Sequence, residues 1–189
     1  MTLMKKIAVI AFLCVLTLGV TAILGWEVIQ HRIALNEQAP DLIRIHQSAD
    51  DFPFRTLDGK VERLSEMRGK VVFVDLWGTW CIQCVAEMPA VQKLYNHYRN
   101  DPNVAFLIIS RLDSPATVRA FAQRHGYDLP FYTMDDGDIP VSMQLHQFPA
   151  TFLYARDGSL AARHTAAANW SAPRVTAFID GLINEPERR

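Results

Sequence analysis

The first feature of the hydrophobic pattern is a long uncharged block near the N-terminus. Residues 7–26 carry no charge and follow Lys5 and Lys6. At about 1.5 Å per residue, a helix over this block is about 30 Å long, the thickness of the hydrocarbon core of a bilayer. The block therefore predicts one transmembrane helix, with the lysines in the cytoplasm and the rest of the chain on the far side. The alternative is a cleaved signal peptide, with Val20-Thr21-Ala22 as the cleavage site.

Residues 27–51 are polar and weakly patterned, and they include Pro40. This segment predicts a linker with room for one short helix at residues 28–35. Residues 52–189 then show the regular hydrophobic pattern of one folded domain, which is long enough to bury a core. The predicted organisation is therefore an anchor at 1–26, a linker at 27–51 and one domain at 52–189.

Two apolar runs dominate the domain. Residues 70–76 and 104–110 predict buried strands, and the spacing of apolar residues between them predicts a helix over 81–99, kinked at Pro89. Together they form a β-α-β unit with parallel strands. The other predicted elements are a hairpin at 52–64, a helix at 114–125, a short strand at 131–132, a short helix at 139–146, strands at 151–154 and 160–164, and a helix at 171–184. Their order predicts an α/β domain with a mixed sheet and helices on both faces.

Composition and charge exclude some classes of function. The net charge is −1, so nothing indicates binding to nucleic acid. Of the three cysteines, only Cys81 and Cys84 follow the apolar block, so no framework of structural disulfides competes for them. The compartment beyond a membrane also allows disulfides to persist.

Cys81 and Cys84 lie two residues apart, after a predicted strand and at the start of a predicted helix. The free N–H groups and partial positive charge of a helix N-terminus stabilise a thiolate. We therefore expect a redox-active disulfide that needs no further cofactor and no metal. Cys81, at the exposed helix start, is the expected attacking thiol, and Cys84, one turn inside, is the expected resolving thiol.

A metal site is the structural alternative for the same two thiols. Zinc needs about four ligands, and the sequence has no second cysteine pair and no metal-like pair of histidines. Copper(I) prefers soft ligands, and Met143 with His146 could join the cysteines. A copper-binding protein therefore stays open as an alternative from another functional class.

Two carboxylates accompany the cysteine pair. Glu87 lies three residues after Cys84 on the same helical face, where it could exchange a proton with Cys84 or simply complement the helix dipole. Asp75 interrupts an apolar strand, and its burial is costly unless it is neutralised or hydrogen-bonded; the alternative is a strand-end aspartate that reaches solvent. Trp77 is expected in the core, whereas Trp80 flanks the reactive sulfur as a candidate substrate contact.

Several ordered motifs resemble one known family across residues 51–182. The element order with Trp80-Cys81-Ile82-Gln83-Cys84 resembles the thioredoxin fold, and the fuller match is to membrane-anchored, TlpA/ResA-like thiol–disulfide oxidoreductases of bacterial envelopes. The motifs are Phe52-Pro53-Phe54 with Leu57-Asp58-Gly59-Lys60, Leu64-Ser65 with Arg68-Gly69-Lys70-Val71-Val72, Trp77-Gly78-Thr79-Trp80-Cys81, Glu87-Met88-Pro89, and Phe148-Pro149-Ala150-Thr151-Phe152-Leu153.

The resemblance implies a thioredoxin-like three-layer fold with a mixed central sheet and an N-terminal hairpin extension. It implies that Glu87 is an active-site carboxylate and that Asp75 occupies the position of the buried aspartate of thioredoxins, where this branch more often has asparagine. It also implies a cis peptide bond at Pro149, which would keep metal from the thiols and expose the Phe148 backbone to an extended client segment.

As to cellular location, the resemblance implies a single-pass protein of the bacterial inner membrane with its domain in the periplasm. The expected partners are a disulfide-containing client protein and a membrane thiol electron donor. A role in cytochrome c biogenesis is less supported, because the glycine-rich, acidic signature of that branch near the loop proline is missing. Two departures, Gln83 in place of proline and the bulky Phe148, leave the direction of electron flow open between a reductase, which we favour, and an oxidase or isomerase.

Overall fold

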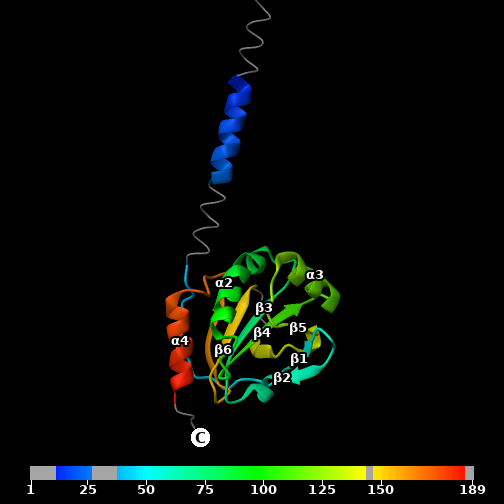
Figure 1. Cartoon of the computed structure of the whole chain (residues 1–189), viewed down its shortest axis with the longest axis vertical. Coiled ribbons are helices and arrows are strands. Elements are labelled where there is room, and N and C mark those ends of the chain that lie inside the picture. The colour runs from blue at the N-terminus through cyan, green and yellow to red at the C-terminus, as the bar shows by residue number, and fades with distance from the viewer. Residues whose placement is uncertain (1–11, 27–37, 144–146, 186–189) are drawn as a thin grey trace, which may run out of the picture.

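The computed structural model of the chain describes residues 12–26, 38–143 and 147–185, and a seven-stranded mixed sheet forms its centre (Figure 1). The strand order is β2-β1-β5-β4-β3-β6-β7. The strands are β1 (Pro53–Thr56), β2 (Val61–Arg63), β3 (Val71–Trp77), β4 (Val104–Arg111), β5 (Phe131–Met134), β6 (Ala150–Tyr154) and β7 (Leu160–Thr165). The helices are α2 (Ile82–Tyr98), α3 (Pro115–His125) and α4 (Pro173–Asn184), with 3-10 turns η1 (Leu64–Met67), η2 (Asp136–Asp138) and η3 (Val141–Met143).

The sheet confirms the predicted mixture of parallel and antiparallel pairs. Strands β3, β4 and β5 run parallel, as the β-α-β pattern predicts. Strands β6 and β7 extend the β3 side as an antiparallel pair. The predicted N-terminal hairpin is also confirmed, since β1 pairs with β2 and joins the other side of the sheet through β5.

Strand β3 lies between β4 and β6, and every one of its residues is buried. Its side chains alternate between two hydrophobic clusters: Phe73 and Trp77 belong to the cluster that contains the helices, and Val72 and Val74 to the cluster on the other face. A continuous apolar run is expected for a strand that is covered on both faces. The turn that follows β3 therefore starts from the centre of the domain.

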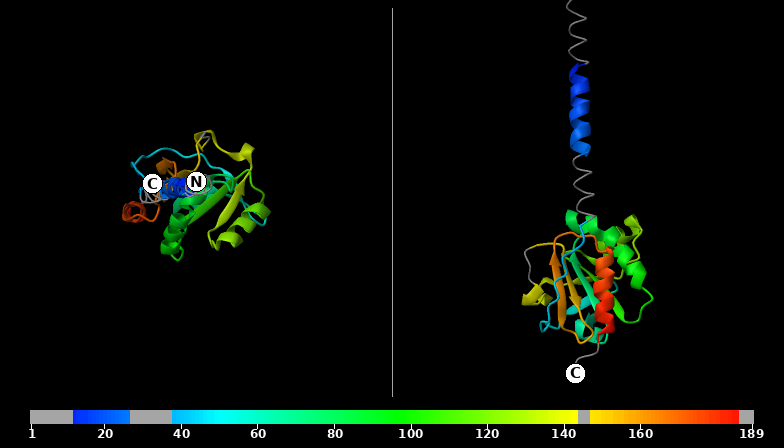
Figure 2. Two further views of the ribbon diagram at one scale, coloured as in Figure 1. Left: turned by 90° about the horizontal axis from the view of Figure 1, so that it is seen from above. Right: turned by 90° about the vertical axis from the view of Figure 1, so that its left-hand side faces the viewer.

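The expectation of helices on both faces is wrong for the described residues. Helices α2, α3 and α4 all contribute to one buried cluster, and Figure 2 shows them on the same side of the sheet. The connections β3-α2-β4 and β4-α3-β5 step across the sheet in one direction, and right-handed crossovers place such helices on one face. The other face is covered by η1, η3 and extended segments.

Most other boundaries agree with the sequence to within a few residues. Helix α3 begins after Ser114, whose hydroxyl accepts a hydrogen bond from the Thr117 N–H, and it ends at Gly126 with φ of 69°. Helix α2 continues past Pro89 to Tyr98. The helix predicted at 139–146 is only the turn η3, and residues 144–146 lie outside the described residues.

The N-terminal segments are described in part. Residues 12–26 are helical, whereas residues 1–11 and 27–37, including the helix predicted at 28–35, lie outside the described residues. None of the helices in the described part of the chain combines the length and the apolar character needed to cross a membrane. Residues 45–47 are bound to β7, since Ile45 N–H donates to Ala161 O at 2.8 Å and Leu160 N–H donates to Gln47 O at 2.8 Å.

Candidate active site

The two cysteines lie at the junction between β3 and α2. Cys81 is the N-cap of α2, and its sulfur accepts a hydrogen bond from the Cys84 N–H at 3.2 Å. Before it, the Cys81 N–H donates to Gly78 O at 3.0 Å and closes a turn directly after β3. The pair is joined as a disulfide with its Cα atoms 5.2 Å apart. One free N–H group of the first turn of α2, that of Cys84, therefore binds the sulfur of Cys81, as expected at a helix N-terminus.

The two cysteine residues differ in their exposure to solvent. The exposed fraction of Cys81 is 8%, whereas that of Cys84 is 0%. Cys81 is thus less exposed than expected for the start of the helix, but it keeps a small exposed surface that Cys84 lacks. This asymmetry agrees with the predicted order of attack by Cys81 and resolution by Cys84.

Trp80 forms the exposed border of the site. Half of its surface is exposed, and its indole N–H donates to Arg111 O at 3.2 Å. The ring lies over Gly78, where an added Cβ would be 2.4 Å from Trp80 Nε1, so that a larger residue would require the Trp80 ring to move. The short turn between β3 and α2 thus presents an aromatic surface next to the accessible sulfur.

Asp113 holds this turn from the loop after β4. Its carboxylate accepts hydrogen bonds from the Thr79 N–H and the Thr79 hydroxyl, both at 2.8 Å, and from the Ser110 hydroxyl at 2.7 Å. Sequence reasoning missed Asp113, because an aspartate between a strand and a helix cap carries no local signal of a partner 34 residues away. Its three bonds fix the position of the residues that precede Cys81.

The loop before β6 lies beside the same turn. The peptide bond between Phe148 and Pro149 is cis, which confirms the prediction from the resemblance. The Phe148 ring contacts the Trp80 ring edge-on, with centroids 5.5 Å apart, and the Arg111 guanidinium lies 5.2 Å from its centroid. The structure therefore brings together Trp80, Phe148 and Pro149, the three predicted substrate contacts.

Glu87 points into the core instead of toward solvent. Only 1% of its surface is exposed. Its Oε2 atom accepts hydrogen bonds from the Trp170 indole N–H at 2.8 Å and from the Ala168 N–H at 3.0 Å. Its Oε1 atom has no hydrogen-bond partner among the described residues. Trp170 and Ala168, which come from the connection between β7 and α4, could not be identified as partners of Glu87 from the sequence.

Asp75 is also fully buried, so the alternative of an aspartate that reaches solvent is wrong. Its position on β3 places it on the face of Phe73 and Trp77, toward the helices. Its Oδ1 atom receives one long contact of 3.5 Å from the Thr151 hydroxyl, and its Oδ2 atom has no hydrogen-bond partner in the described residues.

The two carboxyl groups interact electrostatically. Burial raises the pKa of Asp75 to about 7, and the Thr151 hydroxyl opposes this only weakly. Burial and the charge of Asp75 raise the pKa of Glu87 well above its usual value, against the opposing effect of the two N–H donors. Asp75 and Glu87 therefore titrate as a coupled pair that can hold a proton near neutral pH.

Two further expectations concern Trp77 and the copper alternative. Trp77 is a core residue as predicted, packed between Phe121 and Phe131. Met143 lies in the cluster on the face of the sheet opposite the cysteines, where the Tyr154 hydroxyl contacts its sulfur at 3.7 Å. The structure thus does not bring Met143 to the thiols as a copper ligand, and His146 lies outside the described residues.

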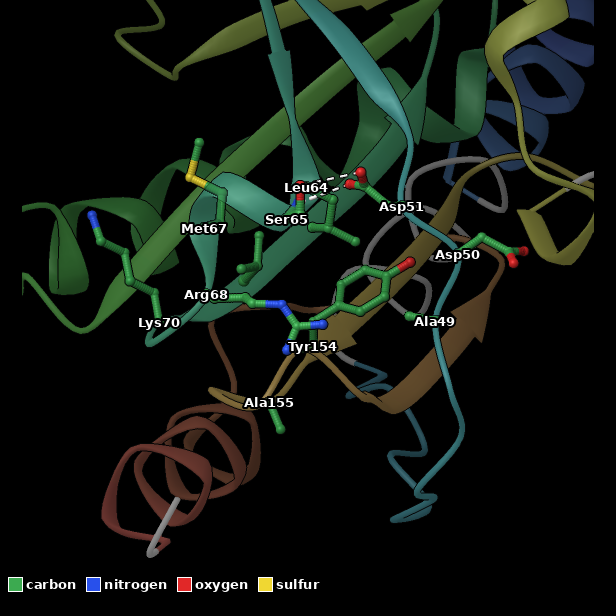
Figure 3. Close-up of a pocket in the computed structure, with 12 residues that line it drawn as sticks. Ala49, Asp50, Asp51, Leu64, Ser65, Met67, Arg68, Lys70, Tyr154 and Ala155 are labelled. Atoms are coloured by element: carbon green, nitrogen blue, oxygen red, sulfur yellow. Dashed lines mark hydrogen bonds between the residues drawn. The ribbon is translucent and has the colours of Figure 1, made fainter. Parts of the chain in front are cut away.

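A hollow on the surface, shown in Figure 3, does not belong to this site. It is lined in part by Asp51, which is hydrogen-bonded to Ser65, and by Lys70, Val72 and Tyr154. Lys70 precedes β3, whereas Cys81 follows the other end of that strand. The hollow and the cysteine pair therefore lie at opposite ends of β3.

Comparisons with known proteins agree with this geometry. A model of the AhpC/TSA family matches residues 45–163. Over 118 residues the chain is 32% identical to the thiol-disulfide oxidoreductase ResA of Geobacillus kaustophilus, covering 62% of this chain and 67% of that protein. Over 114 residues it is 36% identical to the thioredoxin-like protein YneN of Bacillus subtilis, covering 59% and 66%. The solution structure of a thiol:disulfide interchange protein from Bacteroides sp. has the same fold, with a TM-score of 0.62 at 18% identity, over 76% of this chain and 92% of that one.

The burial of Asp75 predicts a pH-dependent cost to stability. Its pKa is about 7 in the folded protein and near 3.8 when unfolded, so the unfolded state loses the proton first and stability falls as the pH rises from about 4 to 7. Asp75→Asn removes this cost. The free energy of unfolding of Asp75→Asn minus that of the parent protein should therefore be larger at pH 7.5 than at pH 4.5, by on the order of 2–4 kcal/mol. Urea unfolding of the oxidised proteins measures this difference.

Asp58→Asn serves as the control, because the Asp58 side chain is 90% exposed on the hairpin. It should show no such trend. An Asp75→Asn effect that is equal at both pH values would contradict the assignment of a buried, protonated Asp75.

Proposed function

The chain belongs to the AhpC/TSA family and is a thiol–disulfide oxidoreductase, and we propose that it reduces disulfide bonds in exported client proteins. The observation that carries the proposal is the difference between the two sulfurs at the N-terminus of α2. Cys81 keeps a small exposed surface and its sulfur accepts an N–H hydrogen bond, whereas Cys84 is fully enclosed one turn later.

The proposed reaction proceeds by two thiol–disulfide exchanges. The Cys81 thiolate attacks one sulfur of the client disulfide, and the other client sulfur leaves as a thiolate that takes up a proton. Cys84 then loses its proton and attacks the Cys81 sulfur, which forms the Cys81–Cys84 disulfide and releases the second client thiolate. The client gains two electrons and two protons, and a dithiol donor must reduce the disulfide again.

Glu87 is the proposed acceptor of the Cys84 proton. Its carboxyl group is buried on the helix that carries Cys84, and it keeps one oxygen without a partner among the described residues. Burial, and after it the charge of Asp75, raises the pKa of Glu87, which makes Glu87 a better base near neutral pH. In this proposal Asp75 tunes the proton affinity of Glu87 and does not itself contact the sulfurs.

The proposed client surface is the aromatic border of the site. Trp80 is half exposed, Phe148 is half buried against it, and the cis peptide bond precedes Pro149 at the start of β6. An extended client segment could pair with the backbone at Phe148 as an added strand while its side chains contact Trp80. Sequence differences at Phe148 would then alter which clients bind.

The proposed location is the bacterial inner membrane, with the domain in the periplasm. The support is the uncharged block at residues 7–26 after Lys5 and Lys6, together with the resemblance to membrane-anchored relatives. In that setting the electron donor would be a membrane thiol protein. The redox potential decides the direction: a value near −270 mV suits a reductant, and one near −120 mV suits an oxidant.

Replacing each cysteine separately tests the order of attack. Cys84→Ser should accumulate mixed disulfides between Cys81 and client proteins, because nothing resolves them. Cys81→Ser should accumulate none and should lose disulfide reductase activity. Non-reducing gels followed by mass spectrometry of the full-length protein measure both results, and full turnover by either variant would contradict the mechanism.

Replacing Glu87 tests the proton transfer. Glu87→Gln should slow the release of client from a preformed mixed disulfide by about 10²-fold at pH values at which a free thiol is protonated. The difference should close as the pH rises above the pKa of Cys84, because the thiol then ionises without a base. Stopped-flow release of a labelled peptide measures the rate.

Glu66→Gln is the matched control, since Glu66 is an exposed carboxylate on η1. It should release client at the parent rate throughout. A rate ratio for Glu87→Gln that does not change with pH would remove Glu87 from the proton transfer.

A further inference from the structure

Trp170 connects a distant part of the fold to the proposed base. It lies in the connection between β7 and α4, and none of its surface is exposed. Its indole N–H donates to Glu87 Oε2 at 2.8 Å across 83 residues of sequence. The Ala168 N–H from the same connection donates to the same oxygen at 3.0 Å. Both residues lie outside the segment matched by the family model, which ends at residue 163.

The bond to Glu87 is not a simple consequence of burying a tryptophan. Trp77 is equally buried in the same cluster, yet its indole N–H has no hydrogen-bond partner among the described residues. The ring of Trp170 packs edge-on against Phe73 at 5.1 Å, which holds the indole in place. Trp170 therefore contributes a directed donor in addition to apolar surface.

The arrangement distinguishes the two oxygens of the Glu87 carboxyl group. Two N–H donors converge on Oε2, so that this oxygen is held by the β7–α4 connection. The other oxygen, Oε1, has no partner among the described residues. Hydrogen bonds from N–H groups favour the ionised form of a carboxyl group, and here they oppose the effects of burial and of Asp75.

The same connection also reaches the proposed client surface. The Ala166 N–H donates to Pro149 O at 3.1 Å, two residues before Ala168. One short segment therefore binds the loop of the cis proline at one end and the buried carboxyl group at the other. A movement of the Pro149 loop could therefore reach the Glu87 carboxyl group through this segment.

We propose that Trp170 is a positioning residue for proton transfer at Cys84: its indole N–H holds Glu87 by Oε2 and leaves Oε1 as the atom that accepts the proton. The proposal rests on the proposed role of Glu87 as the base. The titratable groups that accompany this carboxyl group are Asp75 on β3, Cys84 on α2 and His164 on β7, whose ring lies 5.7 Å from that of Trp170. Burial lowers the pKa of His164, against the opposing effect of the Asp41 charge.

The test removes the N–H donor and keeps the apolar packing. Trp170→Phe in the full-length protein, purified in detergent, should move the acid limb of the pH–rate profile for client release upward by about one pH unit. Trp77→Phe is the matched control, because it removes a buried indole N–H that bonds no described residue and loses the same volume. It should leave the acid limb in place.

A second readout does not depend on activity. Carbon NMR of glutamate labelled at the carboxyl carbon, with Glu87→Gln to identify the signal, follows the titration of Glu87 in the oxidised protein. The pKa of Glu87 should rise in Trp170→Phe and stay unchanged in Trp77→Phe. If Trp170→Phe does not fold, benzothienylalanine at position 170 replaces the N–H by sulfur at nearly the same shape, with the same expected results.

The outcomes separate this proposal from the proposed function. An unchanged Glu87 titration in the variants at position 170 would overturn the inference, even in an active enzyme. A shifted titration with an unmoved acid limb would also overturn it, because Trp170 would then not act on proton transfer. If the parent protein reduced no disulfide at all, the proposed function would instead be rejected. That result needs no variant.

Discussion

The start of α2 determines where the two cysteines and Glu87 lie. The helix begins after one short turn that follows β3, because Cys81 is both the last residue of that turn and the N-cap of the helix. The helix then encloses Cys84 within its first turn and directs Glu87, one turn further, into the core. A shift of the helix start by one residue would turn both side chains away from these positions.

Several parts of the fold hold that helix start in place. Gly78 lets the turn pass beneath the Trp80 ring, and Asp113 binds Thr79 from the loop after β4. Strand β6 begins beside the end of β3, which places Pro149 next to the turn. The site is thus assembled from the ends of three adjacent strands, and α2 covers it from one face.

The buried carboxyl groups are the energetic cost of this arrangement. Asp75 and Glu87 each keep one oxygen without a hydrogen bond among the described residues, which disfavours their charged forms. Sharing protons near neutral pH reduces that cost, and the donors from Ala168 and Trp170 reduce it further for Glu87. Two carboxyl groups at this place do not favour stability, whereas the proposed proton acceptor for Cys84 requires at least one.

The sequence predicted those features that depend on local pattern. The apolar runs of β3 and β4, the helix between them and the position of Cys81 at its start all follow from residues close in sequence. The cis bond at Pro149 was available only through resemblance, because nothing local distinguishes that proline from others. Contacts between distant segments, such as those of Asp113 with Thr79 and of Trp170 with Glu87, could not be predicted, since neither partner carries a signal of the other. Predicting that all three helices lie on one face would require the strand order, which only the structure supplies.

The stabilisation of the Cys81 thiolate by the start of α2 can be measured through the pH dependence of the alkylation of Cys81 in the reduced protein. If the start of α2 stabilises the Cys81 thiolate, the rate of reaction with iodoacetamide should rise with an inflection at least one pH unit below about 8.5, the pKa of a free cysteine, while Cys84 reacts far more slowly. An inflection near 8.5, with the two thiols equally reactive, would contradict it.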